Sequence, residues 1–505
     1  MSMHIRHQIK IFWIALLIAS VPIIITTIND PDLYFHMATG KDMVINHTVD
    51  YSKYYYSQVT DNYADQRYTF LGDIILYMVH FIGQDVGLIL LRVLMVAMCC
   101  YFLFMVSDLK PDFFKLLLLV LLVLGTYQLQ MIRNSIISLG CLSLLFYMID
   151  NRRYFGIIFL LLSWCCIHGS YLLAFAFLCI LAVCDVLDKS VYDRSIARKH
   201  ILLWGLCIAV CFIVINFNNP LTASYFNVNS VKNVVQSSSL NATIFKSDPN
   251  LLSFDFQNPF LLDRWYIRVS FMVAVFTLCV VRPIRFKYVI PFIAIMTVGL
   301  GYVRMVGYIP IVCCYILFTA QRSNHIRKIP QTVCAVILLM VAIGIYTHTD
   351  KLLFSFTEFG FKRNMIYSDR CAKIAAQKYK GEITFNTMDN GSYLLWLWYP
   401  GKRVFIDTHF APHPNIVFTA YKGFCNNPEQ LKQVCRSAII PFNTPKLIKN
   451  FIKAGWYAEY IDSGNVLLSS LKCEVKVLVD QKEYDRMSDK HKRIFNVVLS
   501  ICKGV

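Results

Sequence analysis

Two aspartates and a histidine follow the first apolar segment of the chain, in the stretch INDPDLYFHMATG at residues 28–40. Asp30 followed by Pro31 is typical of a helix start, with Asp30 as the cap and Asp32 in the first turn. Asp32 and His36 are four residues apart, so a helix places them on one face. A carboxylate beside an imidazole can act as a general base, or the two can hold a metal ion. We therefore take Asp32, Asp30 and His36 as candidate catalytic residues, and Asp32 and Asp30 as candidate metal ligands.

The same stretch also has a purely structural interpretation. The carboxylates would then only cap a helix whose apolar side chains rest on the bilayer surface, namely Leu33, Tyr34, Met37, Val44 and Ile45. The pattern of this stretch alone leaves both interpretations open.

Three further ionisable side chains stand at the ends of apolar segments. Arg133 follows TYQLQMI, His168 lies in WCCIHGSY, and Arg304 lies in GYVRMVGYIP. Ionisable residues at membrane depth are costly and tend to mark function. Arginines there can also reach toward lipid head groups, and His168 can be a hydrogen-bonded turn residue. Taken with the acidic stretch, they form the set of charges that would bind an anionic lipid phosphate, so we take all three as candidate substrate-binding residues.

The composition of the 505-residue chain is that of a membrane protein. Hydrophobic residues make up 57% of the chain and charged residues 16%, whereas soluble domains carry about 25% charged residues. The net charge of +18 would suggest a nucleic-acid partner in a soluble protein. Here the basic residues follow membrane loops, so no nucleic-acid partner is expected. The first apolar segment is interpreted as a retained anchor because many apolar segments follow it.

Eleven apolar segments are candidates for transmembrane helices, which need roughly 20 apolar residues each. They lie near residues 11–28, 86–106, 113–127, 135–149, 154–168, 170–186, 201–217, 267–281, 286–301, 304–320 and 330–347. Basic residues concentrate in alternate loops when the N-terminus is placed in the cytoplasm. The bias predicts an integral protein of the inner or plasma membrane, with an outer C-terminus and two long outer loops, 29–70 and 218–266.

The composition changes after residue 347. Short apolar runs (EITFN, RVFID, SAIIPF, YAEYI and NVLLSS) alternate with helical stretches at 367–379, 444–454 and 482–500. This alternation predicts a small α/β domain on the outer side. The expected domains are therefore a transmembrane domain at 1–347 and an extracytoplasmic or periplasmic α/β domain at 348–505.

Two features of the C-terminal region carry possible chemistry. Asp407 ends the expected strand RVFID and is a candidate substrate-binding residue, because ligands bind at the carboxyl ends of strands. The turn Asp389-Asn390-Gly391 is interpreted first as a strand-to-helix connection. Cys425 and Cys435 are a possible disulfide if the region meets an oxidising space.

The order of these motifs resembles bacterial polytopic proteins of the type C glycosyltransferase (GT-C) superfamily, the relatives of polyprenyl-phosphate-sugar-dependent mannosyl- and aminoarabinosyltransferases. NDPDLYFHMATGKDMV resembles the opening Asp-Pro-Asp-Leu-Trp-Trp-His-Leu-Ala-Thr-Gly of that group. NTMDNGSYLLWLWYPGKRVFIDTHF resembles its outer-domain stretch Asn-Trp-Gly-Gly-Tyr-Leu-Ile-Trp…Val-Phe-Ile-Asp-Gly-Arg. MIRNSI, SWCCIHGSYLLA, INFNNPLTASY and GYVRMVGYIP are similar to shorter segments between them. The resemblance covers nearly the whole chain.

The resemblance implies a GT-C-like bundle of about 11 transmembrane helices and sugar transfer from a polyprenyl-phosphate donor to a lipid, glycan or protein acceptor. The acidic residue of the first outer loop is the family's base or metal ligand, which carries over to Asp32 first and Asp30 second. Arg133, His168 and Arg304 then become contacts to the donor phosphate or the acceptor. A divalent metal, Mg or Mn, is the expected cofactor.

The chain also departs from the family pattern. Tyr68-Thr69-Phe70-Leu71 stands where the family often has His-Glu-Trp-Leu, so another acid such as Asp65 or Asp73 is an alternative catalytic residue. Ser392 replaces the second glycine of the outer-domain motif, and Thr408-His409 replaces Gly-Arg. Two other functional classes stay open: a lipid flippase or transporter, and a non-catalytic surface-assembly protein of the same fold.

Overall fold

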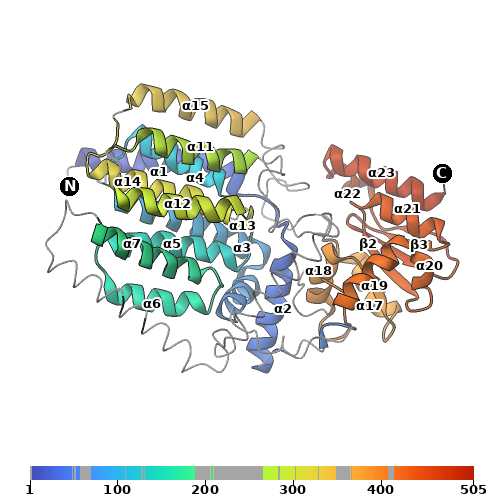
Figure 1. Ribbon diagram of the computed structural model, residues 1–505. Coiled ribbons are helices and arrows are strands. Elements are labelled where there is room, and N and C mark those ends of the chain that lie inside the picture. Colours follow the sequence, from blue (N-terminus) through green and yellow to red (C-terminus); the bar gives the residue numbers. More distant parts are fainter. Residues whose placement is uncertain are drawn as a thin grey trace. The chain divides into compact units, whose positions relative to one another are not determined.

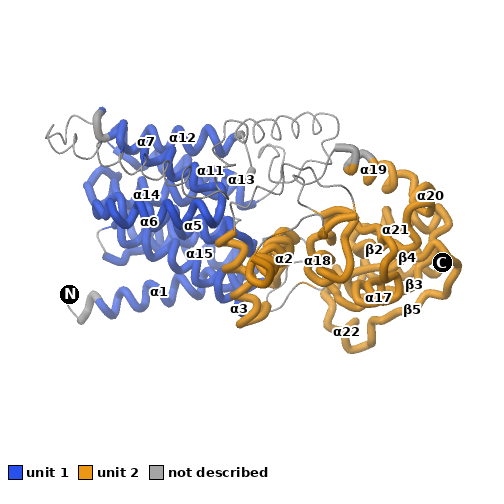
Figure 2. The backbone as a smooth tube through the Cα atoms, turned by 90° about the horizontal axis from the view of Figure 1, so that it is seen from below, with its two compact units in different colours: residues 1–26, 86–353, 359–361 blue, residues 27–85, 354–358, 362–505 orange. Residues whose placement is uncertain are grey.

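The structure is a computed structural model of residues 1–505. The residues it describes are 3–47, 49, 53–56, 70–107, 110–126, 129, 131–187, 205, 209, 265–282, 285–301, 303–327, 329–347, 364, 367–407 and 415–504. The chain forms two compact units. Unit 1 consists of residues 1–26, 86–353 and 359–361, and unit 2 of residues 27–85, 354–358 and 362–505 (Figure 2).

Unit 1 is built from apolar helices (Figure 1). They are α1 (Met3–Ile24), the second part of α3 (Phe70–Val106), α4 (Phe113–Gly125), α5 (Asn134–Asp150), α6 (Tyr154–Cys165), α7 (Tyr171–Leu187), α11 (Trp265–Val280), α12 (Phe286–Gly301), α13 (Val303–Val306), α14 (Ile309–Arg322) and α15 (Gln331–Thr347). Ten of the eleven predicted spans coincide with one of these helices. The predicted span 201–217 and the outer loop 218–266 lie almost wholly outside the described residues.

Two of the described helices are long and apolar enough to cross a membrane, at Arg6–Ile24 and Phe70–Val106, and eight shorter helices are also apolar. Several shorter ones expose large apolar side chains at helical spacing. Phe155 and Phe159 on α6 are 91% and 74% exposed, and Met272 and Val275 on α11 are 62% and 60% exposed. Exposed apolar stripes of this kind mark surfaces that contact a membrane or another protein. They support the prediction of a membrane protein.

The interior of unit 1 is formed by α4 and α14. Nearly every residue of both helices is buried, and α4 packs against α1, α11, α14 and α15. Helices that are apolar on all sides need such a central position. The other helices surround this pair and carry the exposed apolar stripes.

Unit 2 contains a five-stranded sheet with the order β1-β2-β4-β3-β5. The strands are β1 (Thr384–Asn386), β2 (Ser437–Pro441), β3 (Tyr457–Ile461), β4 (Asn465–Ser469) and β5 (Lys476–Val477). The pairs β1–β2 and β3–β5 are parallel, whereas β2–β4 and β3–β4 are antiparallel. The helices are α2 (Pro31–Asn46), the first part of α3, α17 (Arg370–Lys378), α18 (Met388–Trp398), α19 (Asn415–Asn426), α20 (Pro428–Leu431), α21 (Pro445–Lys453), α22 (Gln481–Asp485) and α23 (Asp489–Lys503).

Helices cover both faces of this sheet. Alternate strand residues point to opposite faces, so Ile439 and Leu467 join one core while Ile440 and Val466 join the other. The first core is completed by α2, α17 and α18, and the second by α20, α21 and α23. Residues 27–85, which the sequence analysis places in the transmembrane domain, therefore fold together with the C-terminal chain.

The predicted α/β character of the C-terminal region is confirmed, with corrections in detail. Four of the five expected strands form, but RVFID does not. Only Val404 of that stretch makes an isolated bridge, to Tyr55. Its amide donates to Tyr54 O at 2.9 Å and its carbonyl accepts from Tyr56 N at 3.1 Å, so a segment of the first loop takes the place of a sheet neighbour. The predicted strand-to-helix connection exists but lies earlier: β1 ends at Asn386 and α18 begins at Met388, so residues 389–391 are already part of the helix.

The possible disulfide between Cys425 and Cys435 is absent, because both thiols are free. Burial raises the pKa of Cys425 to about 11 and that of Cys435 to about 12. Buried protonated thiols are inert structural side chains.

Candidate functional site

The acidic stretch begins α2 as predicted. Asp30 caps the helix in an extended conformation, and its Oδ1 accepts the amide of Asp32 at 3.1 Å. Pro31 occupies the first helical position, where its missing N–H costs nothing. Asp30 is 3% exposed and Asp32 is half-buried. The cap uses one oxygen of one carboxylate, so capping alone does not explain the second aspartate.

His36 is bonded to an aspartate far away in the sequence. Its Nδ1 lies 2.7 Å from Oδ1 of Asp73, which is carried by the first part of α3. Thr39 donates its hydroxyl to the other oxygen of the same carboxylate at 2.8 Å. Among the described residues, the carboxylate bonded to the imidazole is therefore Asp73, and not Asp32, which the helical spacing favours. Asp65, the other alternative acid, lies outside the described residues.

Gly40 makes this pairing possible. A Cβ at Gly40 would lie 2.2 Å from the carbonyl oxygen of Asp73. Only glycine allows the backbones of α2 and α3 to approach so closely. Three residues of the motif therefore contact Asp73: His36, Thr39 and Gly40.

The charges around His36 favour its protonated form. Burial alone would lower the pKa of His36, but the charge of Asp73 and its hydrogen bond, together with the charges of Asp32 and Asp30, raise it above its ordinary value of 6.5. Asp30, Asp32, His36 and Asp73 form what we call the α2 acidic group.

Three tyrosines pack beside the α2 acidic group. The rings of Tyr34, Tyr367 and Tyr393 lie 4.8–5.0 Å apart, centroid to centroid. The pKa of Tyr367 is raised well above 10, first by burial and then by the charges of Tyr34, Asp30, Asp389 and Asp32. Asp389 is in the first turn of α18. The turn that the sequence analysis treats as a connection therefore brings a further carboxylate within electrostatic range of the same tyrosine.

Asp407 has structural contacts inside unit 2. It is fully buried, and its Oδ2 accepts the hydroxyl of Tyr55 at 2.7 Å. A Cβ at Gly391 would lie 2.0 Å from the carbonyl oxygen of Ile406, so α18 crosses directly over this segment. This crossing explains why the first glycine of the motif is retained while Ser392 is tolerated at the second. A ligand contact for Asp407 stays a prediction.

The remaining predicted site residues belong to unit 1. Arg133 is buried just before α5, and its Nη2 lies 3.2 Å from Sδ of Met131. His168 lies in the turn after α6, where its Nδ1 accepts from the amide of Ser170 at 3.2 Å and contacts its hydroxyl oxygen at 2.8 Å. The backbone of Arg304 is in α13, and its side chain lies outside the described part of the chain.

These three positions lie at one end of unit 1. Trp164, in the last turn of α6, donates to the hydroxyl of Ser138 near the start of α5 at 2.9 Å. Thr126, at the end of α4, donates to the carbonyl of Gly307 just after α13 at 3.2 Å. Because a short connection joins the end of α4 to the start of α5, these contacts bring the three segments to the same end of the unit. The predicted roles of their side chains are not tested by these contacts.

Arg92 is a buried charge that the sequence analysis does not single out. Its guanidinium is fully buried and donates to the hydroxyl of Thr26 at 2.8 Å and to the carbonyl of the same residue at 2.5 Å. A lone arginine in the apolar run LLRVLM is the signal that marks it. Its contacts tie α3 to the end of α1, which is a structural role.

The residues fit a divalent metal only in part. Among the described residues, no group of three or more His, Cys, Asp or Glu side chains is arranged to hold a metal ion. A magnesium site that uses one or two carboxylates together with substrate phosphate and water needs fewer protein ligands. The metal prediction therefore rests on Asp30 and Asp32.

The comparisons with known proteins give a distant likeness in fold. No family model matches the chain, and no curated protein sequence matches it. Among solved structures, the chain is similar to ArnT from Cupriavidus metallidurans bound to undecaprenyl phosphate, with a TM-score of 0.42 and 11% sequence identity over 92% of this chain and 98% of that one. A similarity this low does not support a function, which has to be argued from the residues of this chain.

Proposed function

We propose that the protein is a membrane glycosyltransferase that moves a sugar from a polyprenyl-phosphate donor to an acceptor on the outer face of the membrane. The observation that supports this most is the α2 acidic group, in which the Asp73 carboxylate of α3 bonds to His36 of α2 and the charges of Asp32 and Asp30 act on the same imidazole. Groups with a shifted pKa, such as His36, concentrate at functional sites. The motif resemblance to GT-C enzymes supplies the reaction class.

The reaction needs one proton transfer and one displacement. The acceptor hydroxyl loses its proton to the α2 acidic group, with Asp32 as the first choice of base and His36 as the second. The acceptor oxygen then forms a bond to the anomeric carbon of the sugar, and the bond from that carbon to the phosphate oxygen breaks. The lipid phosphate leaves with the electron pair of the broken bond.

Basic groups would stabilise the departing phosphate. Arg133 and Arg304 are the candidates, because a guanidinium binds phosphate in a fixed geometry and charge stabilisation supplies much of the rate in such sites. His168 would contact the donor or the acceptor. A divalent cation held by Asp30 and Asp32 would neutralise phosphate charge, as in other sites built from carboxylates and substrate phosphates.

The donor is proposed to be a polyprenyl phosphate sugar because the helices of unit 1 expose large apolar side chains, which is typical of a surface that contacts lipid. A lipid tail can lie against the exposed apolar stripes of unit 1 while its head group meets polar residues. The ArnT structure that this chain resembles in fold was solved with undecaprenyl phosphate. The sugar and the acceptor are left open by the proposal, as is the choice among lipid, glycan and protein.

The test is Asp32→Asn in membranes that contain the full-length protein, supplied with labelled polyprenyl-phosphate sugars. We expect transfer to fall by about 100-fold or more, as for loss of a general base, with unchanged expression. Asp42→Asn is the matched control on the same helix. The Asp42 carboxylate accepts hydroxyls from Tyr54 and Tyr399 at 3.3 and 2.9 Å, so its loss should leave transfer within a few-fold of wild type.

The outcomes separate the functional classes. Unchanged transfer by Asp32→Asn would remove this residue from the mechanism. A wild-type protein that transfers no sugar from any of several donors, but moves labelled lipid phosphate across reconstituted vesicles, would replace the transferase by a flippase. Absence of both activities would favour a surface-assembly protein.

A further inference from the structure

We infer that Asp73 is a positioning residue that holds His36 for proton transfer, and that the imidazole Nε2 takes the proton of the acceptor hydroxyl. The inference rests on the proposed function and decides a question it leaves open, namely which of Asp32 and His36 is the base. The evidence for it is the set of contacts that Asp73 makes. Asp73 belongs to α3, whereas the motif INDPDLYFHMATG belongs to α2 and the residues just before it.

The carboxylate of Asp73 is fixed at both oxygens. Oδ1 lies 2.7 Å from Nδ1 of His36, and Oδ2 accepts the hydroxyl of Thr39 at 2.8 Å. The backbone at Asp73 is fixed as well, because it lies against Gly40 with no room for a side chain. A carboxylate held in this way cannot turn toward a substrate, so its effect must pass through the imidazole.

The hydrogen bond decides which nitrogen is available. A carboxylate accepts hydrogen bonds and does not donate them, so Nδ1 of His36 carries the proton that faces Asp73. In the neutral ring Nε2 is then the acceptor. The His36 side chain keeps 12% of its surface exposed. The arrangement matches the division of labour in hydrolytic triads, where an aspartate orients the histidine and stabilises the imidazolium that forms.

The surrounding charges favour proton uptake. The charged groups that act on His36 are Asp73 from α3, and Asp32 and Asp30 from the start of α2. α18 also packs on α2, and it contributes Asp389 to the neighbouring tyrosine cluster. All of these charges are negative, so they stabilise the imidazolium that forms when His36 takes up a proton. Asp32 is then left to hold the acceptor or a cation.

The experiment compares Asp73→Asn, His36→Ala and the double variant in membranes containing the full-length protein, with transfer measured from pH 5.5 to 9. His36→Ala should lose about 100-fold or more in kcat, and added imidazole should restore part of it. Asp73→Asn should lose about tenfold or more in kcat with little change in KM, because removing an orienting carboxylate impairs the base and not binding. The double variant should be no slower than His36→Ala, since the two residues act as one unit.

The midpoint of the pH profile distinguishes a positioning role of Asp73 from a purely structural one. In the wild type, transfer should rise with pH through a midpoint above 6.5, the ordinary pKa of histidine. In Asp73→Asn that midpoint should shift to lower pH, because the charge that raises the pKa is gone. Thr39→Val is the control, since it removes the other hydrogen bond of the carboxylate and keeps its charge; it should retain the wild-type midpoint. An unchanged midpoint in Asp73→Asn, or additive losses in the double variant, overturns the inference.

A measurement without transfer keeps the inference separate from the proposed function. The raised pKa of His36 contributes stability that is fully present below about pH 6.5 and is lost as pH rises through the folded-state pKa. His36→Gln should remove this pH dependence of stability, measured by thermal unfolding of the purified protein. The measurement does not require the Asp73→Asn variant to fold. If the dependence is present and the wild type transfers no sugar, the transferase proposal fails while the pair stands. If transfer is robust and neither His36 variant changes stability or rate, the pair fails while the transferase stands.

Discussion

Two helices of this protein begin in the same way and are completed differently. α2 in unit 2 is capped by Asp30, whose Oδ1 accepts the amide of Asp32 at 3.1 Å. α4 in unit 1 is capped by Asp112, whose Oδ1 accepts the amide of Lys115 at 2.8 Å. Both caps satisfy a donor that the helix leaves free. The difference lies in the charges placed next to each cap.

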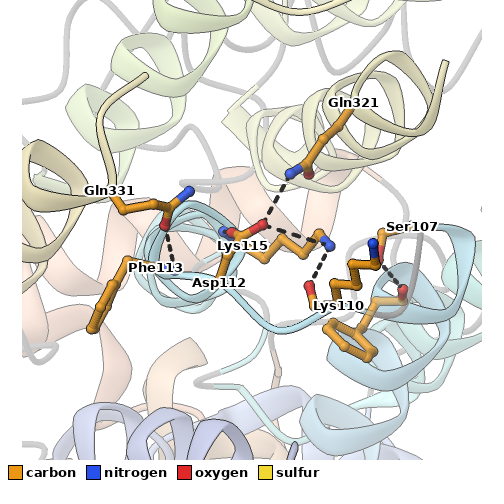
Figure 3. Close-up of polar contacts among 8 residues, drawn as sticks. Ser107, Lys110, Asp112, Phe113, Lys115, Gln321 and Gln331 are labelled. Carbon is orange, nitrogen blue, oxygen red and sulfur yellow. Dashed lines mark hydrogen bonds and ion pairs between the residues drawn. The ribbon is translucent and has the colours of Figure 1, made fainter. Parts of the chain in front are cut away.

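The cap of α4 is matched by neighbouring donors (Figure 3). The Lys115 ammonium, which is fully buried, lies 3.7 Å from Oδ2 of Asp112, and Gln321 of α14 donates to the same oxygen at 3.0 Å. The ammonium also donates to the carbonyl of Lys110, while the side chain of Gln331 accepts the amide of Phe113 at 2.9 Å. We call these contacts the α4 cap cluster. Within it, the buried ammonium of Lys115 lies beside the carboxylate of Asp112.

The α2 acidic group is arranged differently. The carboxylate of Asp73 bonds to the imidazole of His36, and the charges of Asp73, Asp32 and Asp30 raise the pKa of that imidazole. The α4 cap cluster sets a carboxylate beside an ammonium, whereas the α2 acidic group sets carboxylates beside an imidazole, whose charge depends on pH. We expect the α4 cap cluster to stabilise the fold and the α2 acidic group to serve the proposed transfer. Three experiments test this difference between the α2 acidic group and the α4 cap cluster.

The largest effects should come from making the same change, Asp to Asn, at the start of each of the two helices. Asp32→Asn should reduce transfer by about 100-fold or more, because the acceptor or a bound cation loses a charged contact, and should leave the unfolding temperature close to wild type. Asp112→Asn should keep transfer within about twofold and lower the free energy of unfolding by about 1–2 kcal/mol, since Lys115 then lacks its counter-ion. Transfer assays and thermal unfolding on both variants check this. Equal losses of activity would end the distinction between the two clusters.

Gly40→Ala should damage the α2 acidic group through packing. The new methyl group would meet the backbone carbonyl of Asp73 at 2.2 Å, and backbone cannot move aside as a flexible side chain can. We expect a loss of about 1–3 kcal/mol in the free energy of unfolding, as for overpacked cores, together with reduced transfer. Gly83→Ala is the control within the same unit, because nothing lies within 4 Å of its Cβ position. A stable and active Gly40→Ala protein would show that α2 and α3 are farther apart.

The smallest of the three effects is expected for Lys115→Met. This change removes a buried ammonium but keeps the length and apolar volume of the side chain, so part of the lost pairing is regained by packing. The free energy of unfolding should fall by about 1 kcal/mol, and transfer should be unchanged. Lys110→Met, at an exposed position, should lie within about 0.5 kcal/mol of wild type. A loss of transfer in Lys115→Met would give the α4 cap cluster a functional role.

The helices and most strands could be predicted from the sequence because their signals are local. Apolar runs predict ten helices of unit 1, and short apolar runs predict four strands. RVFID is wrong as a strand: among the described residues its sheet-like partner is Tyr55, which lies hundreds of residues earlier. Local pattern carries no information about such a partner.

The candidate site was predictable only in part for the same reason. The helix start at Asp30 follows from residue types at adjacent positions, and the structure has it. Spacing within the helix favoured Asp32 as the partner of His36, whereas the hydrogen bond is made to Asp73, 37 positions away. The glycine at position 40 was visible as a motif residue, but its reason lies in the backbone of another helix.

The folding of residues 27–85 with the C-terminal chain limits how this protein can be divided. The amide of Asn364 donates to the carbonyl of Ile28, and α2 rests on α18. A version that stopped after α15 would leave the apolar side of α2 uncovered and would strip Asp42 of its tyrosine donor at position 399. The C-terminal third of the chain therefore cannot be removed or replaced without changing the surroundings of α2. It packs against α2, the helix that carries the candidate catalytic residues Asp32 and His36.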